Sequence, residues 1–141
     1  MLIAIFTIID QVIKYFIVQN KPFHKVIPGI IEIVYSENTG TVFGIASDNN
    51  TVFLVISLVV LAFFCWVVFS ISKKYEMQRP LCECVIAGGI GNIIDRIVRG
   101  FVVDYLYIKP FGVCNLADIL IVVGIIGIGI AQFVSTIKKS A

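Results

Sequence analysis

Four apolar runs dominate the pattern of hydrophobic and polar positions along the chain. They cover residues 2–19, 51–72, 81–98 and 116–137. A helix that crosses the hydrocarbon core of a bilayer needs about 20 mostly apolar residues. The second run has no charged residue and the fourth has only Asp118, whereas the third is less regular because Glu83, Asp95 and Arg96 lie toward its ends. The pattern predicts four transmembrane helices.

The segment between the first two runs, residues 20–50, has a different pattern. Pro28 and Gly29 indicate a turn. The stretch IIEIVY, residues 30–35, is rich in β-branched and aromatic side chains, which is typical of a strand. We expect a small sheet that lies on the membrane surface. Three apolar side chains farther along are expected to dip into the lipid: Val42, Phe43 and Ile45.

Composition supports this interpretation. The chain has 141 residues, of which 59% are hydrophobic and only 14% charged. A soluble domain of this size cannot bury so much apolar surface, so we expect a single integral membrane domain over residues 1–141. The predicted fold class is an all-α membrane protein with four transmembrane helices and a small β-rich outer-leaflet segment. The net charge of +2, without a basic cluster, argues against a nucleic-acid partner.

Lysine and arginine residues predict the orientation. One basic group lies between the second and third runs and another follows the fourth run: Lys73, Lys74 and Arg79, then Lys138 and Lys139. Basic loops stay in the cytoplasm, so both termini are expected there. Residues 20–50 and 99–115 then face outward. The first run lacks a basic leader and contains Asp10 and Lys14, so we interpret it as a retained span and not a signal peptide.

The four cysteines do not indicate a metal or redox site. Cys82 and Cys84 form C-x-C instead of C-x-x-C, and the single histidine, His24, is distant in sequence. The stretch GGIGNII, residues 88–94, lacks the third glycine of a dinucleotide-binding motif, because Ile94 occupies that position. Close helix packing is the better interpretation of its glycines. No metal and no cofactor is expected.

Polar residues are expected to collect at the outer ends of the helices. Along the chain they are Asn38, Asn92, Asp95, Arg96, Arg99, Asp104, Asn115 and Asp118. Ionisable groups at membrane depth are rare unless they pair or have a function. The i, i+4 spacing of Asp10 and Lys14 favours a neutralising pair, and Asp95 is most simply an ion-pair partner of Arg99 or Arg96. We therefore interpret Asp10, Lys14 and Asp95 as structural.

Asp118 and Asp104 leave two interpretations open. Asn115 and Asp118 match a helix N-cap with an acid three residues later, so capping alone can explain both. Asp104 lies in the apolar stretch GFVVDYLYI with no base beside it. If Asp104 faces Asp118, the two carboxylates share one proton and supply an acid and a base together. The helix start favours charge on Asp118, which makes Asp104 the expected proton holder. No G-x-S-x-G nucleophile motif is present.

At these residues the chain resembles a known family. The matching stretches are DQVIK at 10–14, NTGTVFG at 38–44, GGIGNIIDRIVRGFVVDYL at 88–106 and NLAD at 115–118. In order and spacing they are similar to the lipoprotein signal peptidases (signal peptidase II), bacterial four-span aspartic proteases. The chain departs from the usual pattern in having Cys114 where an aromatic residue is common, and Thr41 and Val42 where alanines are common.

The resemblance implies a role for each matching residue. Asp104 and Asp118 correspond to the catalytic aspartates, and the substrate-binding positions correspond to Asn38, Asn92, Arg96 and Asn115. The expected reaction removes the signal peptide of a prolipoprotein just before its diacylglyceryl-modified cysteine, through an activated water. Prolipoproteins and membrane lipid are then the partners, and the site lies near the outer leaflet of the bacterial cytoplasmic membrane. Two alternatives stay open: a small transporter or channel subunit that uses the acids as an ion relay, and a structural membrane module.

Overall fold

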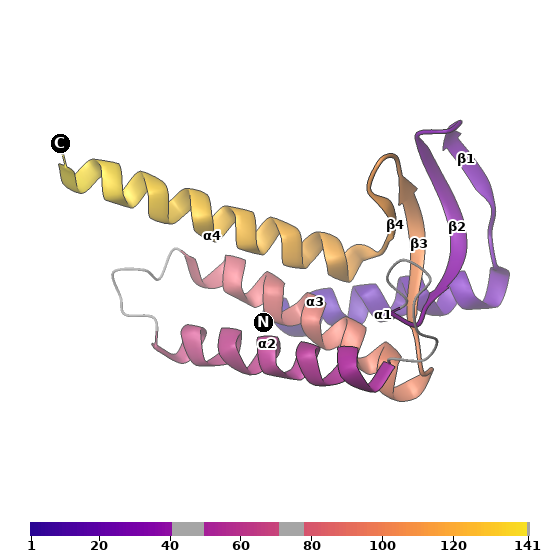
Figure 1. Ribbon diagram of the computed structural model, residues 1–141, viewed down its shortest axis with the longest axis horizontal. Helices are drawn as coiled ribbons and strands as arrows, with labels where there is room; N and C mark the ends of the chain where they lie inside the picture. Colours follow the sequence, from indigo (N-terminus) through magenta and orange to yellow (C-terminus); the bar gives the residue numbers. More distant parts are fainter. Residues whose placement is uncertain (41–49, 71–77, 141) are drawn as a thin grey trace.

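The computed structural model describes residues 1–40, 50–70 and 78–140. Within these residues the chain forms four helices and one four-stranded sheet. The helices are α1 (Leu2–Asn20), α2 (Asn50–Ser70), α3 (Arg79–Val98) and α4 (Leu116–Ser140). The strands are β1 (His24–Ile27), β2 (Ile31–Asn38), β3 (Val102–Ile108) and β4 (Gly112–Cys114). The helices run along the long axis of the molecule and the sheet stands across one end (Figure 1).

The helices occupy the positions of the predicted spans. Residues 2–19, 81–98 and 116–137 fall within α1, α3 and α4, and residues 51–70 of the second run fall within α2. In the described part of the chain, α1 and α4 are long and apolar enough to cross a membrane. Helix α2 contains a shorter apolar stretch, Thr51–Val67. The predicted helical architecture is confirmed, while the crossing of the membrane by all four helices stays a prediction.

Helix α3 is the least apolar of the four because it lies between the others. It packs against α1, α2 and α4. The buried apolar core accordingly includes Cys82, Val85, Ile86, Ala87 and Ile93 from this helix. A helix surrounded by other helices can carry polar side chains, because neighbouring helices and not lipid meet them.

Two glycines of the GGIGNII stretch allow α3 to approach its neighbours closely. A Cβ atom on Gly88 would collide with the carbonyl oxygen of Ala117 in α4. A Cβ atom on Gly91 would lie 2.5 Å from Oδ2 of Asp10 in α1. The interpretation of these glycines as helix-packing residues is confirmed, and the close approach brings polar groups of α1, α3 and α4 together.

The sheet is antiparallel with the strand order β1-β2-β3-β4. The predicted strand at 30–35 is confirmed as β2, which extends farther, to Asn38. The pairing of β2 with β3 places Ser36 opposite Asp104 and Asn38 opposite Val102, so Asn38 and Asp104 are near neighbours. The predicted lipid contacts of Val42, Phe43 and Ile45 lie outside the described residues, as does Thr41.

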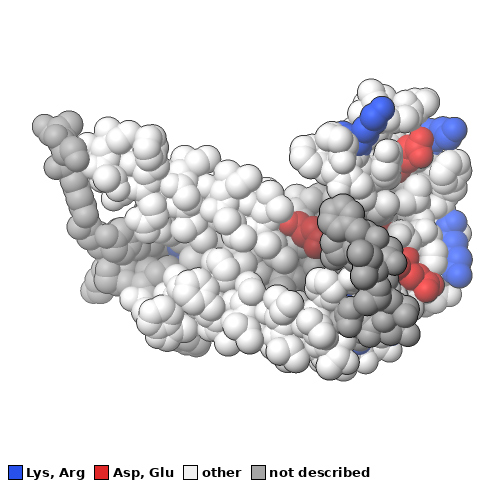
Figure 2. Space-filling model, in the orientation of Figure 1, with Lys and Arg blue, Asp and Glu red and all other residues white. Residues whose placement is uncertain are grey.

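The surface differs between the helices and the sheet. Large apolar side chains are exposed along the helices, for example Ile8, Val59, Trp66, Ile130 and Phe133. In Figure 2 the visible charged side chains gather mainly at the sheet end, while the helices present an almost uncharged surface. Exposed apolar helix surfaces of this extent are typical of contact with lipid.

Candidate active site

The start of α4 is closed by a reciprocal capping arrangement. The backbone N–H of Asp118 donates to Oδ1 of Asn115 at 2.9 Å, and the backbone N–H of Asn115 donates to Oδ2 of Asp118 at 3.2 Å. The sequence-based interpretation of these residues as a capping pair is confirmed. Capping occupies only one carboxylate oxygen of Asp118. The other, Oδ1, accepts a hydrogen bond from Nδ2 of Asn92 at 2.8 Å.

Two further N–H groups at the start of α4 find partners on other elements. The N–H of Leu116 donates to the hydroxyl of Tyr105 in β3 at 3.1 Å. The N–H of Ala117 donates to Oδ1 of Asp10 in α1 at 3.1 Å. The first turn of a helix carries unsatisfied N–H groups, and here α1 and β3 both contribute to satisfying them. This end of α4 is therefore held at a defined position against the sheet and α1.

Asp104 lies in β3 and is only 2% exposed. Its Oδ1 accepts a hydrogen bond from Nδ2 of Asn115 at 2.7 Å, and its Oδ2 accepts one from Nδ2 of Asn38 at 2.9 Å. Burial raises the pKa of Asp104 to about 6, with the nearby charge of Asp118 acting in the same direction and the two amides acting against it. Asp104 therefore keeps its proton to a higher pH than an ordinary aspartate.

Amide groups connect the two acids. Asn115 binds Asp104 through its side chain and Asp118 through its backbone N–H and its Oδ1. Asn92 accepts a hydrogen bond from Nδ2 of Asn115 at 3.2 Å and donates to Asp118. The sequence analysis expected the two carboxylates to share a proton directly. The structure places both at one site, linked through Asn115 and Asn92. We call Asp104, Asp118, Asn38, Asn92 and Asn115 the carboxylate site.

A second group of buried polar residues lies beside the first, between α1 and α3. Lys14 is fully buried, and its Nζ lies 2.9 Å from Oδ2 of Asp10 and 2.9 Å from Oδ2 of Asp95. Arg99 also pairs with Asp95. The predicted pair Asp10–Lys14 is confirmed, and of the two partners expected for Asp95 the structure pairs it with Arg99. The contact of Lys14 with Asp95 was not predicted, because the residues lie far apart in sequence.

Gln11 is a polar residue that the sequence analysis missed. Its Nε2 donates to the carbonyl oxygen of Gly91 at 3.0 Å and lies 3.2 Å from Asp10 and 3.3 Å from Asp95. Its Oε1 accepts a hydrogen bond from Arg99. The sequence contained one signal for this role, because Gln11 is an amide next to Asp10 within an apolar run. We call Asp10, Gln11, Lys14, Asp95 and Arg99 the α1–α3 charge cluster.

The side-chain amides of Asn92 and Asn38 each have one possible orientation, because a neighbouring group that can only donate hydrogen bonds contacts the amide oxygen. The ammonium of Lys14 donates to Oδ1 of Asn92 at 2.9 Å, so the NH₂ group of Asn92 must face the other way, toward Asp118. In the same manner the backbone N–H of Gly40 donates a hydrogen bond to Oδ1 of Asn38. The NH₂ group of Asn38 therefore faces Asp104. Both acids receive oriented amide donors.

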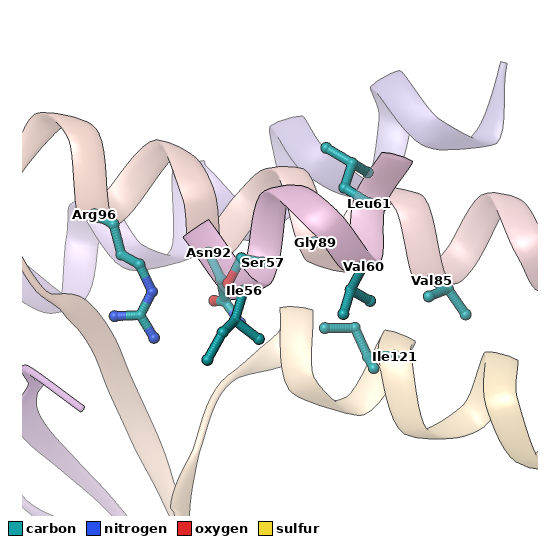
Figure 3. A pocket seen from close by; sticks show the side chains of 9 residues that line it. All are labelled: Ile56, Ser57, Val60, Leu61, Val85, Gly89, Asn92, Arg96 and Ile121. Atoms are coloured by element: carbon teal, nitrogen blue, oxygen red, sulfur yellow. The ribbon is translucent and has the colours of Figure 1, made fainter. Parts of the chain in front are cut away.

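Arg96 lies beside the carboxylate site on α3. Its charge interacts with those of Asp104 and Asp118. Its guanidinium group lies over the ring of Phe53 in α2, 5.4 Å from the ring centroid. Arg96 and Asn92 also line one end of a pocket of about 140 Å³ between α2, α3 and α4, which we call the helix pocket. Figure 3 shows Arg96 and Asn92 at that end and Val85 toward the other.

The cysteines of the C-x-C stretch and the histidine lie on different elements. Cys82 and Cys84 lie on α3, whereas His24 lies on β1. Within residues 1–40, 50–70 and 78–140, no group of three or more His, Cys, Asp or Glu side chains has the geometry of a metal site.

The exposed apolar helices, together with the acidic groups that lie where the helices meet the sheet, are the features of a membrane protein. Comparison with known proteins gives the family. The model of the family Signal peptidase (SPase) II matches residues 2–134, and the chain belongs to this family of bacterial peptidases.

Individual relatives agree with the family assignment. The chain is 37% identical to the lipoprotein signal peptidase of Streptococcus pneumoniae (strain ATCC BAA-255 / R6), over 88% of this chain and 84% of that protein. It is 33% identical to the lipoprotein signal peptidase of Staphylococcus aureus (strain JH9), over 98% of this chain and 90% of that protein. A solved bacterial membrane enzyme superposes with a TM-score of 0.83 at 30% identity, over 96% of this chain and 87% of that one. The chain is accordingly a bacterial membrane protein.

Proposed function

We propose that the chain is an aspartic endopeptidase that removes signal peptides from diacylglyceryl-modified prolipoproteins, with Asp104 and Asp118 as its catalytic residues. The observation that carries this proposal is the pair of acids at one site, each holding amide donors on both carboxylate oxygens. The amide donors add no formal charge, and the burial of Asp104 outweighs them and raises its pKa, so the pair can hold a proton there. The names of the two relatives supply the substrate class.

The mechanism assigns a different task to each acid. Asp118, as the ionised base, takes a proton from a water molecule while the water oxygen attacks the scissile carbonyl carbon. Asp104, as the protonated acid, donates a hydrogen bond to the carbonyl oxygen. When the C–N bond breaks, a proton from the acid pair passes to the leaving amine. The raised pKa of Asp104, about 6, supports this assignment of the proton.

The neighbouring polar residues divide into two groups in this proposal. Asn38, Asn92 and Asn115 donate to the acids, so we assign them to positioning the carboxylates. Arg96 lines the helix pocket and lies near both acids, so we assign it to a backbone carbonyl of the bound peptide. The arrangement requires that a water and the peptide reach the space between Asp104 and Asp118.

We further propose that α1 to α4 all cross the cytoplasmic membrane, with both termini in the cytoplasm and the sheet at the outer leaflet. The exposed apolar surfaces of the helices support the crossing. The carboxylate site lies where α3 and α4 meet the sheet, so this topology puts it near the outer leaflet. A lipid-modified cysteine reaches that depth without leaving the bilayer.

The test replaces Asp104 and Asp118 singly by Asn in the full chain, purified in lipid nanodiscs. Each change should lower kcat/KM on a diacylglyceryl-modified precursor peptide by about 10²–10⁴-fold, the usual contribution of an acid or base. Each variant should remain folded, with a lower unfolding temperature than the parent, because the new NH₂ group of Asn faces a hydrogen-bond donor. Glu37→Gln, at an exposed acid on β2, is the matched control and should keep full activity.

Cleavage near the parental rate in either variant would refute the two-aspartate mechanism. Loss of the folded protein in both variants would favour a purely structural role for the acids. Proton flux across proteoliposomes, together with no cleavage by the parent protein, would favour the transporter alternative.

A further inference from the structure

A second apolar hollow also borders the carboxylate site, at Asp118. It has a volume of about 310 Å³ and lies between the β3–β4 hairpin and one face of α4. Its apolar walls are formed by Ile108, Phe111, Cys114, Ile119, Val122 and Val123, and Asp118 also lines it. We call it the hairpin groove. Figure 2 shows an indentation between α4 and the upper part of the sheet, where the groove lies.

The hairpin groove opens to the surroundings of α4. Phe111, in the turn between β3 and β4, is 87% exposed. Val122 and Val123 on α4 are each more than half exposed. The turn is held in place, because the N–H of Lys109 donates to the carbonyl oxygen of Ile30 in the neighbouring β1–β2 turn at 3.0 Å. A hydrocarbon chain in the bilayer beside α4 thus reaches the groove sideways, without passing through water.

The two hollows that border the carboxylate site differ in chemistry. The helix pocket contains the polar side chains Ser57, Asn92 and Arg96 among its apolar walls. A bound peptide needs such groups, because buried N–H and C=O groups without partners are costly. In the hairpin groove Asp118 is the single charged lining residue, and the Cys114 thiol already donates to the carbonyl oxygen of Leu106. A hydrocarbon needs no hydrogen-bond partner, so the groove suits an acyl chain better than a peptide.

We propose that the hairpin groove binds one acyl chain of the diacylglyceryl group of the substrate, while the peptide part of the signal sequence lies along the helix pocket. Phe111, Cys114 and Val122 then determine which acyl chains are accepted. This inference rests on the proposed function. Both hollows border the carboxylate site, and the lipid and the scissile bond belong to the same modified residue. One substrate therefore fills both hollows when its scissile carbonyl lies at the acids.

The experiment compares two synthetic precursor peptides that differ only in the acyl chains on the glyceryl-cysteine, dipalmitoyl and dihexanoyl. Val122→Trp fills the groove and should lower kcat/KM for the dipalmitoyl peptide about tenfold or more, since a few methylenes in a pocket discriminate to this degree. The dihexanoyl peptide should be cleaved at near the parental rate. Ile130→Trp is the matched control on α4, similarly exposed but away from the groove lining, and should leave both rates unchanged.

Val60→Trp, which narrows the helix pocket, should slow both peptides equally because their peptide parts are identical. A direct readout uses a dipalmitoyl peptide with a diazirine near one chain end, bound to the inactive Asp118→Asn variant. Photocrosslinks are expected at Ile119, Val122 or Val123. The proposal is overturned if Val122→Trp slows both peptides equally, or if Val60→Trp alone changes the chain-length preference. Failure of the parent to cleave either peptide would instead count against the proposed function.

Discussion

The α1–α3 charge cluster and the carboxylate site each contain two aspartates that accept hydrogen bonds from amides, but in the charge cluster cations are added to these donors. In the charge cluster Asp10 and Asp95 share the ammonium of Lys14, and Asp95 also binds Arg99. In the carboxylate site Asp104 and Asp118 accept hydrogen bonds from amides. A nearby cation and an amide donor both favour an ionised carboxylate, but an amide adds no charge, and at Asp104 burial outweighs the amides and raises the pKa.

Asn92 connects the two regions. Its oxygen accepts a hydrogen bond from Lys14 in the charge cluster, and its NH₂ group donates to Asp118 in the carboxylate site. The charge cluster thus has two consequences: it joins α1 to α3, and it orients an amide that holds one of the proposed catalytic acids. Buried ion pairs are weak stabilisers in general, so a positioning role gives a physical reason for such a cluster in this molecule.

The largest effect is expected from Lys14→Met, which removes the cation at the centre of the cluster. Two buried carboxylates would then lack their shared partner, and breaking a buried ion pair from one side costs about 3–5 kcal/mol. The folded protein should be strongly destabilised, as measured by its unfolding transition in detergent micelles. Lys25→Met, at an exposed lysine on β1, is the control and should leave the transition unchanged.

The double variant Asp10→Asn/Lys14→Met removes one charge of each sign and sharpens the comparison. It should recover much of the stability lost in Lys14→Met, because Asp95 keeps Arg99. Its kcat should stay below that of the parent, because Asn92 lacks the donor that orients it. A double variant no more stable than Lys14→Met, or one with full kcat, would contradict the positioning role.

A smaller loss of stability is expected from a substitution at Gly91, where α3 contacts the charge cluster. In Gly91→Ala the new Cβ would lie 2.5 Å from Oδ2 of Asp10 and 3.2 Å from its Cγ, so the Asp10 side chain or α1 must shift. Overpacking of this kind typically costs about 1–3 kcal/mol. Gly89→Ala is the matched control two residues away. Its nearest neighbour would be Cδ1 of Leu61 at 3.6 Å, an ordinary contact. Equal stability of the two variants would show that α1 adapts to a side chain at position 91.

The smallest effect concerns the pH dependence of the carboxylate site. The pKa of Asp104 is raised to about 6, so the proton required of it in the proposed mechanism is lost as the pH rises through that value. The kcat/KM of the parent should fall on this alkaline side. The hydrogen bond from Asn38 lowers the pKa of Asp104, so Asn38→Ala should raise that pKa and move the fall to higher pH. The profile of kcat/KM against pH measures this shift.

Glu37→Gln is the control for this shift. Glu37 neighbours Asn38 on β2, and its carboxylate accepts a hydrogen bond from the hydroxyl of Tyr35. In this variant the fall of kcat/KM on the alkaline side should occur at the same pH as in the parent. If Asn38→Ala leaves this fall in place or moves it to lower pH, Asp104 is not the group whose proton limits the rate.

Local patterns were sufficient for much of this molecule. The apolar runs located the four helices and the β-branched stretch located β2. The i, i+4 spacing identified the pair Asp10–Lys14 and restricted the partner of Asp95 to Arg99 or Arg96. The capping of α4 by Asn115 and Asp118 was also predictable from four consecutive residues. These features depend on side chains within one or two helical turns, so their partners are near in the sequence.

The tertiary structure decided the rest. The contact of Lys14 with Asp95, the role of Gln11 and the amide link between Asp104 and Asp118 join residues on separate elements. Helix packing at Gly88 and Gly91 and the register of β2 with β3 bring these groups together. The sequence alone determined which residues are polar in an apolar chain. Their partners, and hence which acids pair with a cation, depend on distances across helices and strands that only packing sets.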